Sequence, residues 1–125
     1  MHPTLLSATA CLFATIPVHA FHARNAVYHH LFLLVTVLSL LFHLTHDPFL
    51  KYIDTAVAHT AFLFMLEETC NLGNPRLALF PLVVACLWML QTGAHRERQD
   101  ALHAGLHVVS VAGVHAFLLA KQMET

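Results

Sequence analysis

The amino-acid sequence predicts an all-α fold, a polytopic bundle of five transmembrane helices. Its 125 residues are 58% hydrophobic and only 10% charged, which is too apolar for an ordinary soluble domain of this size. Long apolar runs alternate with short polar segments that carry helix start and stop signals. Twelve histidines stand out, because an imidazole inside a membrane is costly unless it faces a cavity, a partner or a metal. One domain accounts for residues 1–125.

The first apolar run predicts a helix over about residues 4–21. Pro17 is expected to kink this helix or to end its regular part, because proline removes a backbone donor. A cleaved signal peptide is the alternative, which would leave four helices. We favour a retained helix, since no Lys or Arg precedes the run.

The second and third helices are expected over about residues 26–45 and 48–69. Asn25 is a suitable N-cap for the second helix. Asp47 and Pro48 mark both a stop and a start, because the residue before proline resists helical geometry while Asp-Pro is a favourable opening for the next helix. The second helix is long enough to span a bilayer.

The last two helices are expected over about residues 75–92 and 101–120. Asn74 followed by Pro75 repeats the opening signal of the third helix, and Gly93 is expected at the end of the fourth. The charged run 95–100 is interpreted as a solvated loop, with Asp100 capping the fifth helix. The protein is expected to be integral to a membrane, and no particular organelle is indicated. Positive charges divide evenly between the two sides of this arrangement, so the positive-inside rule gives no orientation.

Two classes of function are excluded by composition. The six Lys and Arg are scattered rather than clustered, so the basic surface that nucleic acids require is missing. The three cysteines, at positions 11, 70 and 86, are too far apart to form a CxxC metal site or to suggest a disulfide framework.

Two pairs of polar side chains lie inside apolar helices. Ser39 and His43 are four residues apart, as are His103 and His107, so each pair lies on one helix face about 6 Å apart along the axis. Asp54 follows soon after the first pair, near the start of the third helix. Two membrane crossings separate the turn after His43 from the turn before His103. All five side chains are therefore expected at one depth, which requires the second, third and fifth helices to be mutual neighbours.

Three neutral imidazoles around one open coordination position are typical of a catalytic zinc site. His43, His103 and His107 are therefore the candidate metal ligands, and zinc is the candidate cofactor. Zinc activates water near neutral pH and polarises a carbonyl group. Asp54 is the candidate base for the water, and Ser39 the candidate donor to the developing oxyanion. The implied reaction is hydrolysis of an amide or ester of a lipid substrate within the membrane.

The order Ser39, His43, Asp54, His103 and His107 resembles the motif of the CREST superfamily of membrane hydrolases. That superfamily includes alkaline ceramidases, the adiponectin and progestin receptor group, and enzymes that remodel GPI-anchor lipids. The resemblance covers about residues 26–70 and 100–118, and Ser110 follows the second histidine of the pair as a serine often does there. It implies zinc bound by the three histidines, with Asp and Ser acting on water and substrate. Members of the superfamily have seven helices, whereas this chain has room for five.

Two other functions stay open at this point. The chain is suited to a small structural subunit of a larger membrane complex, with the motif retained as a closed metal site, and a homo-oligomer is a further arrangement. Alternatively, His29 and His43 are spaced to ligate two stacked haems on one helix of an electron carrier. Haem ligation leaves Ser39 and Asp54 without a role.

Overall fold

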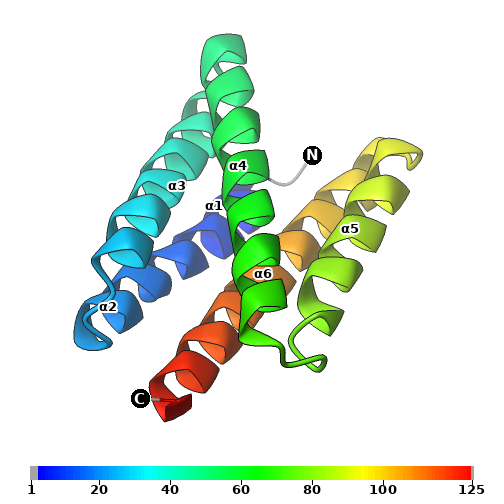
Figure 1. Cartoon of the computed structure of the whole chain (residues 1–125). Coiled ribbons are helices and arrows are strands. Elements are labelled where there is room, and N and C mark those ends of the chain that lie inside the picture. Colours follow the sequence, from blue (N-terminus) through cyan, green and yellow to red (C-terminus); the bar gives the residue numbers. More distant parts are fainter. Residues whose placement is uncertain (1–2, 125) are drawn as a thin grey trace.

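The computed structural model describes residues 3–124 of the chain (Figure 1). Within these residues the secondary structure is helical, with short turns and no strand. Five helical segments follow one another, and the predicted all-α fold is confirmed. Four of the segments are long and apolar enough to cross a membrane, and they cover Leu5–His22, Ala26–Thr45, Pro48–Leu72 and Arg96–Met123.

The first segment is a helix interrupted near its middle. It consists of α1 (Pro3–Cys11), the 3₁₀ turn η1 (Leu12–Ala14) and α2 (Thr15–His22). Pro17 explains the interruption, because a proline ring clashes with the carbonyl four residues earlier and offers no N–H to it. That carbonyl belongs to Phe13, in the centre of η1. The irregularity expected at Pro17 therefore lies one turn before it.

Helix α3 (Ala26–Thr45) has the expected bounds. The side chain of Asn25 accepts a hydrogen bond from the backbone N–H of Tyr28, as an N-cap does. At the other end His46 adopts a left-handed conformation with φ of 55° and closes the helix with a bond to the carbonyl of Phe42.

Helix α4 (Pro48–Leu72) begins where the Asp-Pro signal places it. The Asp47 carboxylate accepts hydrogen bonds from the backbone N–H groups of Phe49 and Leu50. The helix continues beyond its expected end at residue 69, and Gly73 terminates it with a φ of 73°, a conformation that glycine adopts without strain.

Helix α5 (Leu79–Thr92) begins later than the expected position 75. Asn74 does accept a bond from the N–H of Arg76, but residues 74–78 form tight turns, such as the bond from Leu77 N–H to the Asn74 carbonyl. The Asn-Pro signal therefore marks a turn before the helix and not its first turn.

Helix α6 (Arg96–Glu124) is longer than expected at both ends, and the prediction that Asp100 caps it is wrong. The charged run forms the first turns of α6 instead of a loop. Arg, Glu and Gln are favourable helix formers, so their polarity alone does not end a helix. Glu97 also lies in the first turn, where a negative charge interacts favourably with the helix dipole.

The first segment occupies the centre of the bundle, between α3 and α6. Ala10, Ile16 and Ala20 are fully buried, and the segment packs on both of these longer helices. Helix α4 packs chiefly on α3, and α5 packs on α6, as the two pairs in Figure 1 show. The expectation that α3, α4 and α6 are mutual neighbours is thus only partly met, because α1 and α2 separate much of α3 from α6.

The contact between α5 and α6 depends on a glycine. A Cβ atom at Gly113 would lie 2.8 Å from Cβ of Phe80, whereas a Cβ at Gly105 on the same helix would meet nothing within 4 Å. Gly113→Ala should therefore lower the stability of the detergent-solubilised protein by about 1–3 kcal/mol relative to Gly105→Ala. Both changes bring the same gain in helix propensity, so the difference in denaturation midpoint isolates the clash. Equal midpoints would contradict this packing.

Candidate metal centre

Three histidines from two helices converge in the interior of the bundle. His43 comes from α3, and His103 and His107 come from successive turns of α6. One ring nitrogen from each residue lies within 4.8 Å of the other two. The ring centroids of His43 lie 5.3 Å from those of both His103 and His107, and those of His103 and His107 are 4.5 Å apart. The predicted ligands are therefore placed together.

The outer nitrogens of the two α6 histidines have partners on other helices. Nδ1 of His107 lies 2.9 Å from the hydroxyl oxygen of Thr9 on α1. Nδ1 of His103 lies 3.3 Å from Oε1 of Gln91 on α5. Phe13 of η1 also contacts the His107 ring edge to face, with centroids 5.5 Å apart. These contacts orient the rings of His103 and His107 through Nδ1, so the Nε2 atom of each ring can bind another partner.

His43 is the third member, and its Nε2 is a buried polar atom without a hydrogen-bond partner. The residue is only 3% exposed. A buried polar atom without a partner is costly, and such atoms in native proteins often mark an ion or water site. The three imidazoles therefore fit a transition metal such as zinc, which prefers nitrogen ligands in this number.

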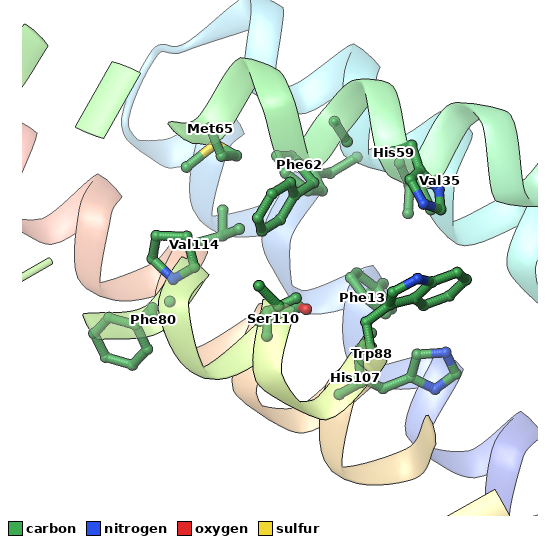
Figure 2. Close-up of a pocket in the computed structure, with 18 of the residues that line it drawn as sticks. Phe13, Val35, His59, Phe62, Met65, Phe80, Trp88, His107, Ser110 and Val114 are labelled. Carbon is green, nitrogen blue, oxygen red and sulfur yellow. The ribbon is translucent and has the colours of Figure 1, made fainter. Parts of the chain in front are cut away.

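A cavity of about 320 Å³ adjoins the histidines. Figure 2 shows side chains of α4, such as Phe62 and His59, on one side, and Phe80, Ser110 and His107 of α5 and α6 on the other. The lining residues of α6 run from His103 to Phe117, a length of about 20 Å along a helix axis. Away from the histidines most of the lining is apolar, with Val35, Met65, Val84, Trp88, Val114 and Phe117 among its members.

The two candidate catalytic residues line this cavity together with His103 and His107. Ser39 is buried on α3, one turn from His43, and Asp54 is half-buried in the second turn of α4. Ser110 lies one turn beyond His107 and also faces the cavity. Asp54 does not belong to the compact metal-binding group that the described residues form. A carboxylate and two hydroxyls thus lie around the cavity beside the imidazoles.

Several histidines outside this group have partners elsewhere in the bundle. Nδ1 of His29 lies 2.8 Å from the carbonyl oxygen of Pro17. His115 bonds to the neighbouring segment, with Nδ1 lying 2.7 Å from Nδ1 of His19 and Nε2 lying 2.7 Å from the hydroxyl of Thr15. His46 is exposed at the end of α3. None of these belongs to the three-histidine group.

Sequence reasoning missed Thr9, Phe13 and Gln91, which contact the metal-binding group from α1, η1 and α5. A signal existed for the first two. Leu6, Phe13 and the fully buried Ile16 recur at helical spacing, and Thr9 lies on the same face. Gln91 has no such signal, because its position at the end of an apolar helix is equally typical of a solvated side chain.

No protein-family model, curated protein or solved structure matches this chain. Its geometry supports two chemical abilities. The imidazoles can bind a divalent transition metal, and the cavity beside them can take an elongated apolar molecule whose polar group lies near Ser39 and Asp54.

Replacing any one of His43, His103 and His107 by Ala should remove most of the bound metal, because two imidazoles alone hold zinc weakly. His29→Ala is the matched control, since His29 is on the same helix as His43 but about 20 Å away along its axis. Elemental analysis and the visible spectrum of the purified variants measure the loss. A cofactor lost as completely from His29→Ala as from His43→Ala would contradict the three-histidine site.

Proposed function

We propose that the chain is an integral membrane hydrolase that uses zinc to cleave an amide or ester bond of a lipid. The observation that carries the proposal is the contact between the three-histidine group and a long apolar cavity that also contains a carboxylate. The order of the site residues along the chain, which resembles the CREST superfamily, supports the same function.

Zinc held by His43, His103 and His107 would supply a Lewis acid and activate water. Asp54 would accept the proton of the attacking water from its position on α4. Ser39 and Ser110 present hydroxyls to the same cavity, where a donor can stabilise the developing oxyanion. The leaving group would take up a proton from the Asp54 carboxyl.

The shape of the cavity supports a substrate with a long apolar chain. Its lining runs along α4, α5 and α6, from the histidines toward Phe117 and Leu77. Water is excluded most effectively by such a lining, which strengthens the electrostatic interactions of the polar end. Helices α4 and α5 meet at the cavity wall through an edge-to-face contact of His59 with Trp88, whose ring centroids are 4.9 Å apart. Separation of these two rings would give a lipid a lateral route into the cavity from the bilayer.

A catalytic site fits better than a closed structural metal site, since Asp54 lies in the cavity wall but outside the three-histidine group. A haem site fits less well. Two axial imidazoles lie on opposite faces of a porphyrin, whereas the rings of His43, His103 and His107 contact one another directly, with centroids 4.5–5.3 Å apart.

Asp54→Asn separates an enzyme from a structural metal site. The change keeps the shape of the side chain but removes its basicity, so lipid hydrolysis should fall by about 100-fold or more. Zinc should be retained, because the three imidazoles remain. The assay combines zinc content with hydrolysis of a panel of ceramides and phospholipids in mixed micelles.

Asp47→Asn is the matched control for this experiment. It makes the same chemical change seven residues earlier, at an N-cap where Asn is as suitable as Asp, so zinc and activity should be unchanged. Wild-type protein that hydrolyses no lipid, together with Asp54→Asn protein that has lost its zinc, would contradict the enzyme and indicate a structural metal site.

A further inference from the structure

Thr9 makes three short contacts with a single hydroxyl group. Its oxygen lies 3.0 Å from the carbonyl oxygen of Leu5, 3.1 Å from that of Leu6 and 2.9 Å from Nδ1 of His107. A hydroxyl has one proton to donate and two lone pairs to accept with. Since carbonyl oxygens can only accept, the proton of Thr9 is directed toward its own helix. Toward His107 the hydroxyl oxygen is therefore the acceptor.

The direction of this hydrogen bond determines the tautomer of His107. The donor must be Nδ1–H, and a neutral imidazole carries only one N–H. Nε2 is then left with a free lone pair, the form in which an imidazole binds a metal. The ring is 4% exposed and contacts both His43 and His103, so this lone pair is available within the three-histidine group.

We propose that Thr9 is a positioning residue of the metal centre, which holds His107 in the Nδ1–H tautomer and fixes its ring orientation. The inference deepens the proposed function and rests on it for the identity of the metal, but the tautomer itself does not depend on a metal. It also makes α1 a functional part of the site, although α1 supplies no ligand.

The second α6 histidine is held in a parallel way. Nδ1 of His103 faces Oε1 of Gln91, which is an acceptor, so His103 is also an Nδ1–H donor with Nε2 free. Two flanking helices, α1 and α5, thus select the same tautomer at successive turns of α6. Outer partners of this kind orient metal-bound histidines and raise their affinity for the ion.

The chain contains a natural control for Thr9. Thr15 in the same segment likewise lies 2.6 Å from a carbonyl of its own helix, that of Leu12, and 2.7 Å from a histidine of α6, His115. His115 is outside the metal-binding group. Thr15→Val therefore removes the same kind of hydroxyl from the same kind of contact without touching a candidate ligand.

The first test compares zinc affinity among three variants of the full chain, by competition with a chromophoric chelator in detergent. Thr9→Val keeps the side-chain shape and should weaken zinc binding by about 10- to 100-fold. Thr9→Ser restores the hydroxyl and should recover most of the affinity, while Thr15→Val should match wild type. Unchanged affinity in Thr9→Val, with zinc bound by wild type, would overturn the role of Thr9 and leave the proposed hydrolase intact.

The second test needs no metal and no substitution at Thr9. Long-range ¹H–¹⁵N spectra of metal-free wild-type protein labelled at histidine distinguish the two tautomers, and His107→Ala identifies the signal. The expected result is Nδ1–H at His107. An Nε2–H tautomer would overturn the inference. Wild type that binds no zinc but shows Nδ1–H at His107 would refute the proposed metal centre while supporting the hydrogen bond from His107 to Thr9.

Discussion

Three imidazoles, two of them buried and one half-buried, meet at one point, and buried ring nitrogens require hydrogen-bond or metal partners. Thr9 and Gln91 satisfy the outer nitrogens of His107 and His103. The first contact needs α1 beside α6, and the second needs the end of α5 beside the start of α6. Nε2 of His43, which is buried beside the rings of His103 and His107, has no hydrogen-bond partner. The proposed metal ion would give all three rings a common partner.

Much of the fold could be predicted, because the helix ends of α3 and α4 carry local signals. Asn25 and Asp47 make the capping bonds that their sequence positions suggest. The start of α5 could not be placed, since Asn-Pro opens a tight turn as readily as a helix. The start of α6 was misplaced for a different reason. The charged residues of its first turns are typical of a solvated loop, yet they are also favourable helix formers.

The site was predictable to the extent that it depends on spacing and on the number of membrane crossings. The pair His103 and His107 shares a helix face by its spacing, and the crossing number places His43 at the same depth. The residues that hold these rings could not be predicted in the same way. Thr9 and Gln91 are single polar residues on apolar helices, and only the packing of α1 and α5 determines what they face.

The division of the bundle into two hairpins has a mechanical consequence. Helix α4 packs on α3, α5 packs on α6, and the cavity lies between these two hairpins, which meet at the contact of His59 with Trp88. His43 belongs to one hairpin, while His103 and His107 belong to the other. A metal ion bound by His43, His103 and His107 would link the two hairpins. Separation of the hairpins and loss of the ion would then be coupled, so a ligand that widens the cavity would also weaken the binding of the metal.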